Sequence, residues 1–158
     1  MAQRESVAII SGACGDIGRA IALELSRRGA SVGLSDVVAT EAAESLVRKV
    51  RAMGRSARYD RVDVTDALAV ERWIGNVQNE VGDVKWVIAS AATVTIASAM
   101  LVTPEQWRRE LDINLSGSFF FARAGAASLL KAKRDGRIIF VGSWAAHAPH
   151  ANLPAYSV

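Results

Sequence analysis

The stretch SVAIISGACGDIGRAIALELSRRG, residues 6–29, joins an apolar run to an amphipathic run through a turn rich in glycine. The first six residues are mostly apolar and β-branched, which is typical of a strand covered on both faces. Ile17, Ile21 and Leu25 then recur at helical spacing, and Gly29 stands where a helix would end. The stretch therefore predicts a strand, a sharp turn and a helix.

The same alternation continues along the chain. Further strands are expected at residues 30–36, 56–64, 84–91 and 137–143. Helical patterns occupy residues 39–54, 66–82 and 103–134. Thr40 is a plausible cap for the second helix, and Thr65 or Asp66 for the third. The alternation favours an α/β fold whose parallel sheet is covered by helices on both faces, because right-handed crossovers place each helix over the sheet. A flavodoxin-like strand order would give the same string of elements.

The composition is that of an ordinary globular protein, with 51% hydrophobic and 22% charged residues. A chain of 158 residues is long enough for a single domain with a real core. No apolar run approaches a membrane span, and no signal peptide is evident. The lone cysteine, Cys14, excludes an intramolecular disulfide and suits a reducing cytoplasm. The net charge of +3 arises from basic residues interleaved with acids, so neither nucleic acid nor a membrane is expected as a partner.

The glycine turn has the features of a phosphate-binding loop. Gly12, Gly15 and Gly18 would let a pyrophosphate approach the backbone N–H groups at the start of the next helix, where the dipole favours an anion. A turn without any ligand would use the same glycines, but the order of strand, loop and helix near the N-terminus favours a nucleotide site. An Asp16 carboxylate beside a pyrophosphate would be unfavourable unless it points away.

Asp36 ends the second expected strand, eighteen residues after Gly18. A carboxylate there can accept hydrogen bonds from both hydroxyls of an adenosine ribose, and it would repel a 2′-phosphate. No arginine follows it directly, so NAD is expected as the cofactor, with NADP less favoured. The alternative interpretation is that Asp36 only caps a helix or a turn.

These features resemble the short-chain dehydrogenase/reductase family, whose T-G-x-x-x-G-x-G loop corresponds to residues 11–18, with Ser11 for the threonine and Asp16 for the middle glycine. The resemblance covers the whole chain and implies a doubly wound parallel sheet of Rossmann type in three layers. Residues 1–158 would then be one dinucleotide-binding domain, the N-terminal part of a subunit, incomplete at its C-terminal side. The cofactor contacts that the resemblance implies are Gly12, Cys14, Gly15, Asp16, Ile17, Gly18, Asp36, Asp63, Val64, Ser90 and Ala91.

Asp63 has an alternative interpretation, and residues 89–92 depart from the family's motif. Asp63 is similar to the family's aspartate beside the adenine ring, although a strand-end aspartate before a capping threonine would look the same. The family's N-N-A-G motif is replaced by ASAA at residues 89–92, so two amides and a glycine are absent at this strand end. Ser90 can still donate and accept hydrogen bonds there.

The resemblance also implies three catalytic residues. Residues 112–117, DINLSG, are similar to the family's N-x-x-G stretch, so Asn114 would bend its helix and hold a water in a proton relay. Ser143 follows a strand as the catalytic serine does and would hydrogen-bond the substrate oxygen. Tyr156, thirteen residues later, would be the acid/base group. A tyrosine hydroxyl needs a nearby cation to act as a base near neutral pH. The family's lysine would fall two residues beyond Val158, so a piece of a longer protein or a truncated product is expected.

The leading hypothesis is an NAD-dependent oxidoreductase that interconverts a secondary alcohol and a ketone. The first alternative is a non-catalytic remnant that binds a dinucleotide without turnover. A methyltransferase-like fold that binds S-adenosylmethionine is a weaker alternative, because the pair of Ser143 and Tyr156 argues against it. The apolar helix at residues 119–130 resembles a subunit interface, which implies a homodimer or homotetramer. His147 and His150 have no further ligand nearby in sequence, so no metal site is expected.

Overall fold

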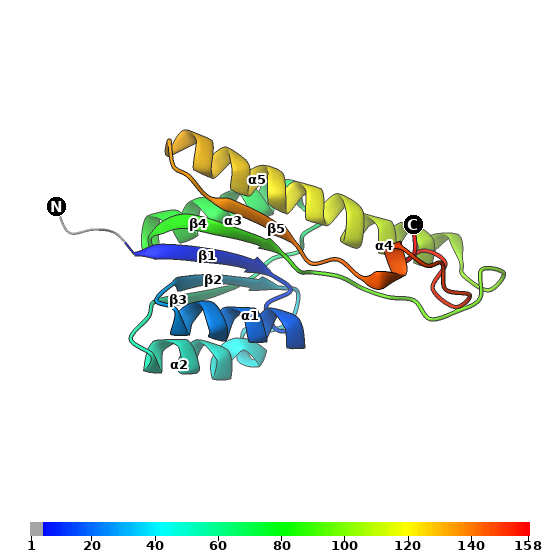
Figure 1. Ribbon diagram of the computed structural model, residues 1–158, viewed down its shortest axis with the longest axis horizontal. Coiled ribbons are helices and arrows are strands. Elements are labelled where there is room, and N and C mark those ends of the chain that lie inside the picture. The colour runs from blue at the N-terminus through cyan, green and yellow to red at the C-terminus, as the bar shows by residue number, and fades with distance from the viewer. Residues whose placement is uncertain (1–4) are drawn as a thin grey trace.

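The computed structural model describes residues 5–158, and its centre is one parallel sheet of five strands in the order β3-β2-β1-β4-β5 (Figure 1). The strands are β1 (Ser6–Ser11), β2 (Ser31–Asp36), β3 (Ala57–Arg61), β4 (Asp83–Ala89) and β5 (Arg137–Phe140). The chain builds outward from β1 to β3 and then crosses back to place β4 on the other side of β1. This order is that of a Rossmann-type doubly wound sheet, so the flavodoxin-like alternative is wrong.

Helices cover both faces of the sheet. The helices are α1 (Asp16–Arg27), α2 (Glu44–Ala52), α3 (Ala67–Glu80), α4 (Pro104–Leu111) and α5 (Ser118–Lys131). Figure 1 shows α1 and α2 on one face, and α3 and α5 on the other. The helical segment Asp112–Gly117 joins α4 to α5 without a break and has the wider π-helical hydrogen bonding. The predicted three-layer α/β architecture is confirmed.

The apolar run in β1 explains the layering. Val7 and Ile9 point into the cluster shared with α3 and α5, whereas Ala8 and Ile10 point into the cluster shared with α1 and α2. All four side chains are completely buried. A central strand of a parallel sheet has no solvent face, which is why its sequence lacks polar alternation.

Several local expectations need correction. Thr40 does not cap the second helix, because it begins a 3₁₀ turn (Thr40–Ala43) that precedes α2, and Ala43 takes the cap position of α2 without a side-chain bond. Of the two candidates for α3, Asp66 is the cap, and its carboxylate accepts a hydrogen bond from Ala69 N at 2.9 Å. The strands β3 and β5 end at Arg61 and Phe140, earlier than predicted, although Val62 N and Val141 N still donate to the neighbouring strands β2 and β4.

The strand β5 lies at the edge of the sheet, and its four residues are exposed. Its apolar side chains Ile138, Ile139 and Phe140 are 40%, 45% and 59% exposed. The segment after β5 carries Ser143 and Tyr156, and Figure 1 shows it beyond the carboxyl ends of the strands. Within residues 5–158, no helix has the length and apolar character that crossing a membrane requires.

Candidate functional site

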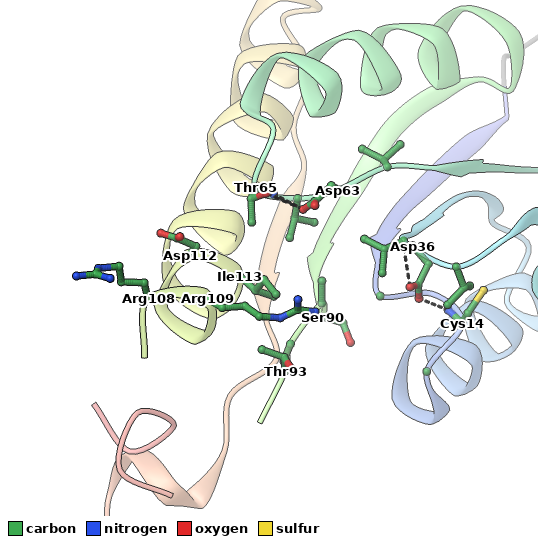
Figure 2. Close-up of a pocket in the computed structure, with 18 of the residues that line it drawn as sticks. Cys14, Asp36, Asp63, Thr65, Ser90, Thr93, Arg108, Arg109, Asp112 and Ile113 are labelled. Carbon is green, nitrogen blue, oxygen red and sulfur yellow. Dashed lines mark hydrogen bonds between the residues drawn. The ribbon is translucent and has the colours of Figure 1, made fainter. Parts of the chain in front are cut away.

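A cleft of about 800 Å³ opens at the carboxyl ends of the strands, bordered by the loops after β1 to β4 and by α4 (Figure 2). It spans the boundary between β1 and β4, where the winding of the sheet reverses, and ligands of such sheets bind at this point. The predicted cofactor residues that line it are Gly12, Cys14, Gly15, Asp36, Asp63, Val64, Ser90 and Ala91. Asp16, Ile17 and Gly18 are not part of its lining.

The loop after β1 lies directly against the end of β4. Gly12 has a φ of +64°, and a Cβ atom on it would lie 2.7 Å from the Cα atom of Ala91. The hydroxyl of Ser11, which is buried, accepts hydrogen bonds from the N–H groups of Ser90 at 3.1 Å and Ala91 at 3.2 Å. The strand-end serine therefore joins the two halves of the cleft, and Gly12 permits their close approach.

Gly18 does not line the cleft, and it lets α1 pack closely against the glycine loop. A Cβ atom there would lie 2.2 Å from the carbonyl oxygen of Gly12, so only glycine lets α1 start this close to the loop. Asp16 and Ile17 are exposed on the outer side of the first turn of α1. Asp16 thus lies outside the cleft lining, and its carboxylate stabilises the positive end of the helix dipole. Because the Asp16 carboxylate lies outside the cleft lining, it would not be placed beside a pyrophosphate bound in the cleft.

Asp36 has a structural role that its sequence position did not reveal. Its Oδ2 atom accepts a hydrogen bond from Cys14 N at 2.9 Å, and its Oδ1 atom accepts one from Val37 N at 2.8 Å. The carboxylate therefore ties the loop after β1 to the end of β2 (Figure 2). Each oxygen still has acceptor capacity for a hydroxyl of a ligand in the cleft. The turn and the ribose interpretations of Asp36 are thus compatible.

Two arginines bond to backbone carbonyls of residues that neighbour or contact Asp36. Arg19 of α1 donates from Nε to the carbonyl of Cys14 and from Nη2 to that of Ala42, both at 2.7 Å. Arg61 donates to the carbonyl of Val37 at 2.8 Å. Neither arginine lines the cleft. The sequence shows no cation directly after Asp36, and it does not reveal Arg19 or Arg61 because tertiary contacts bring these arginines to the end of β2.

Asp63 organises the turn between β3 and α3. Its Oδ1 atom accepts hydrogen bonds from the backbone N–H of Thr65 at 2.9 Å and from its hydroxyl at 2.8 Å. Val64 also lines the cleft and packs against the joint between α4 and α5, since a Cβ atom on Gly117 would lie 2.6 Å from Val64 Cγ2. Asp63 therefore forms a turn with Thr65 after the strand, while Asp66 is the cap of α3.

Cys14 is poorly suited to be a reactive thiol. Burial raises the pKa of the Cys14 thiol, and the negative charge of Asp36 raises it further, whereas Arg19 opposes this rise. We expect iodoacetamide to alkylate Cys14 more slowly than a free thiol at mildly alkaline pH, because a raised pKa leaves less thiolate. Asp36→Asn should accelerate the reaction. Mass spectrometry over time measures both rates, and alkylation as fast as that of glutathione would contradict the expectation.

Asn114 lies within the π-helical segment and bonds to the segment that follows β4. Its Oδ1 atom accepts a hydrogen bond from Thr93 N and its Nδ2 atom donates to Thr93 O, both at 2.8 Å. Thr93 itself lines the cleft. Irregular π-helical turns often occur at functional sites. Both functional atoms of the amide are therefore occupied by backbone in this structure.

The structure places Ser143 and Tyr156 outside the cleft lining, in the segment beyond β5. Ser143 opens a short 3₁₀ turn, and its hydroxyl accepts a hydrogen bond from Ala145 N at 3.3 Å. Tyr156 is partly buried in a turn closed by a bond from Ser157 N to Leu153 O at 3.0 Å. No hydrogen bond connects Ser143, Tyr156 and Asn114 with one another among the described residues.

Sequence reasoning missed Arg109. Figure 2 shows its side chain directed across the cleft toward Ser90, whereas Arg108 points away. Arg108 lies 3.7 Å from Glu105, but Arg109 forms no ion pair or hydrogen bond with any residue in the range 5–158. Neighbouring residues of a helix point in directions about 100° apart. The sequence alone does not show which of the two arginines faces the cleft.

Comparison with known proteins identifies the family of this chain and several of its relatives. The short chain dehydrogenase family matches residues 6–158. The chain is 33% identical over 137 residues to trihydroxynaphthalene reductase of Colletotrichum orbiculare, covering 87% of this chain and 48% of the relative. It is 30% identical over 156 residues to galactitol 2-dehydrogenase of Agrobacterium fabrum, covering 99% and 59%.

A crystal structure of NAD+-bound xylitol dehydrogenase superposes with a TM-score of 0.91 at 28% identity, covering 99% of this chain and 60% of that one. The chain thus spans about half the length of the curated relatives. The glycine loop, the strand order and the match over nearly every residue lead to one conclusion: the chain belongs to the short-chain dehydrogenase family.

Proposed function

We propose that the protein is an NAD-dependent oxidoreductase that interconverts a secondary alcohol and a ketone. The cleft carries this proposal, because the glycine loop, the Asp36 carboxylate and the Ser90–Ala91 backbone converge in it. Gly12 and Gly15 line the cleft with backbone only. A dinucleotide needs such a bare loop for its pyrophosphate and a carboxylate for its ribose, so the residues present fit the group.

Each part of the cleft would then hold one part of the cofactor. The loop from Gly12 to Gly15 would bind the pyrophosphate, Asp36 would accept the hydroxyls of the adenosine ribose, and Asp63 with Val64 would border the adenine. Bound NAD supplies the acceptor or donor of a hydride. The protein's own task is to orient the substrate and to move a proton at its oxygen atom.

Tyr156 is the proposed acid/base group, and Ser143 is the proposed hydrogen-bond partner of the substrate oxygen. The hydroxyl of Tyr156 makes no hydrogen bond with another described residue, so it is available to a substrate. Asn114 would act through its place in the helix, because its amide is already bonded to Thr93. The change to π-helical bonding around it alters the backbone ladder, and a carbonyl released there could hold a water.

The direct test is a titration with NAD followed by a screen for turnover. Polyols such as galactitol and xylitol are the first candidates, since the related enzymes are named for them. We expect saturable NAD binding by calorimetry and formation of NADH with at least one secondary alcohol. NAD binding without turnover in the protein expressed from its full coding sequence would favour the non-catalytic alternative. No NAD binding at all would contradict the proposal.

Cofactor preference gives a second test. Asp36 lines the cleft and would repel a 2′-phosphate, so NAD should bind more tightly than NADP. Asp36→Ala should narrow this difference, and it should also weaken NAD binding because the carboxylate holds Cys14 N–H. Calorimetric titration of both cofactors measures the effect. Tighter binding of NADP by the unaltered protein would show that Arg19 and Arg61 outweigh Asp36.

Arg109 should contribute to the affinity for the cofactor. Its unpaired guanidinium points across the cleft, so it can bind an anionic group of NAD (Figure 2). Arg109→Gln should weaken NAD binding by about threefold to tenfold, as expected for the loss of one exposed charge-assisted hydrogen bond. Added salt should reduce the difference. Arg72→Gln on α3, which removes an exposed arginine outside the cleft lining, is the control and should change the affinity little. Equal effects of the two variants would contradict this role.

The apolar surface of the helical segment from α4 to α5 supports the proposed self-association. Leu115, Phe119 and Leu130 are 65%, 58% and 78% exposed on it. Large apolar side chains exposed along one helical segment are candidates for a protein interface. We therefore expect a homodimer or homotetramer, which light scattering of the purified protein would measure. A monodisperse monomer would contradict this expectation.

A further inference from the structure

Glu110 is the only buried residue of α4, and it is a carboxylic acid. Its exposure is 0%, and the neighbouring helix residues Glu105 to Arg109 are all exposed. A helix normally buries apolar side chains, and a buried carboxyl group is costly unless its oxygens are hydrogen-bonded. Glu110 therefore has a role that a solvated surface acid would not have.

Glu110 and Asn114 both form hydrogen bonds with the backbone of residues 93–95. Its Oε2 atom accepts a hydrogen bond from Thr95 N at 3.0 Å, while Asn114, one turn further along the helix, bonds to both backbone groups of Thr93. Four helical residues rise by about 6 Å, and two extended residues span about 6.6 Å. Side chains at positions 110 and 114 thus match alternate residues of an extended segment. Together they hold residues 93–95 as a neighbouring strand would.

The segment held in this way leads to the proposed acid/base group. Ala92 and Thr93 line the cleft, and Ala97 N donates a hydrogen bond to Asn152 O at 3.0 Å. Asn152 precedes the turn that contains Tyr156, which is closed by the bond from Ser157 N to Leu153 O. A continuous series of contacts therefore runs from Glu110 through residues 95–97 to the segment of Tyr156.

We propose that Glu110 is a positioning residue that fixes residues 93–97 and, through them, the Tyr156 segment. Its acceptor oxygen Oε2 performs this role, whereas its Oε1 atom is buried and has no hydrogen-bond partner among residues 5–158. The acceptor, and not the negative charge, is what the Thr95 N–H requires. Glutamine keeps this acceptor and leucine removes it at a similar volume, so the two substitutions separate the hydrogen bond from simple packing.

The first test measures amide hydrogen exchange and does not depend on any enzymatic activity. In Glu110→Leu, the Thr95 amide should exchange at least about tenfold faster, since a hydrogen bond to a buried donor is lost. The Ala97 amide should also exchange faster. Glu110→Gln should preserve the protection of both amides. Glu71→Gln on α3, which removes an exposed acid, is the control and should change neither. Unchanged protection in Glu110→Leu, or equal loss in the leucine and glutamine variants, would overturn the proposal.

The second test rests on the proposed oxidoreductase function and uses the protein expressed from its full coding sequence. Glu110→Leu should lower kcat by about tenfold with NAD affinity changed by less than about twofold, because residues 95–97 do not line the cleft and Thr93 stays bonded to Asn114. Glu110→Gln should restore most of kcat. If exchange changes as expected but kcat does not, the link from Glu110 to Tyr156 is wrong. Absence of turnover in the unaltered protein would contradict the proposed function instead, and leave the exchange result standing.

Discussion

Replacement of Tyr156 with phenylalanine is expected to lower turnover by about 10²–10⁴-fold, the usual contribution of a general acid or base. The substitution removes the transferable proton and keeps the ring. Because the hydroxyl of Tyr156 has no hydrogen-bond partner among residues 5–158, its loss should not disturb the surrounding turn. Tyr156 also lies outside the lining of the cleft, so the affinity for NAD should change by less than about twofold.

The assay needs the protein expressed from its full coding sequence and an alcohol that the unaltered enzyme oxidises. Ser143→Ala provides a comparison, since it should lower turnover while leaving the Tyr156 proton in place. Calorimetry on each variant separates a loss of cofactor binding from a loss of chemistry. Ordinary turnover by Tyr156→Phe would remove this residue from the mechanism.

Replacement of Gly18 with alanine is expected to destabilise the fold and weaken NAD binding together. The added Cβ atom would lie 2.2 Å from the carbonyl oxygen of Gly12 and 2.8 Å from the Cα atom of Ala13. Both are backbone atoms, so no side-chain rotation relieves the contact, and α1 or the loop must shift. Overpacking of this kind costs about 1–3 kcal/mol, which should lower Tm by about 3–12 °C for a domain of this size. The displaced loop should bind NAD at least about tenfold more weakly.

Gly75 provides the matched control. It lies in the interior of α3, and a Cβ atom on it would meet nothing within 4 Å. Gly75→Ala should therefore stabilise the protein by about 0.5–1 kcal/mol, because alanine restricts the unfolded chain and favours the helix. Thermal unfolding and NAD titration of both variants give the comparison. A similar Tm for the two variants would show that the loop tolerates a side chain at position 18.

Local patterns predicted most of the fold. The apolar run of β1 and the helical spacing in α1 depend on the nearest residues in sequence, and both elements are found where the pattern placed them. Element boundaries were less predictable. Thr40 has a good capping side chain, yet the chain forms a 3₁₀ turn there before α2 begins. The helical pattern predicted over residues 103–134 is continuous in the structure, but the sequence did not reveal its π-helical segment, where Gly117 packs closely over Val64.

The candidate site shows where prediction from sequence ends. The glycine loop, Asp36 and the catalytic candidates Asn114, Ser143 and Tyr156 were recognisable as residue types at family spacings. The hydrogen-bond partners of these residues could not be predicted from the sequence. Asp36 holds Cys14 N–H, Asn114 holds Thr93, and Arg109 crosses the cleft while Arg108 does not. Each of these facts depends on the direction of a side chain relative to a distant element.

The amino-acid sequence alone thus specified the alternation of strands and helices, the glycine loop and the family, because these follow from periodicity and from glycine positions within a short range. Tertiary structure was needed for the strand order β3-β2-β1-β4-β5, for the contact of Gly12 with Ala91, and for the burial of Glu110. Local propensities cannot encode such contacts, since they join residues far apart in the chain. They form only when the two halves of the sheet meet at β1 and β4, and the cleft forms at that boundary.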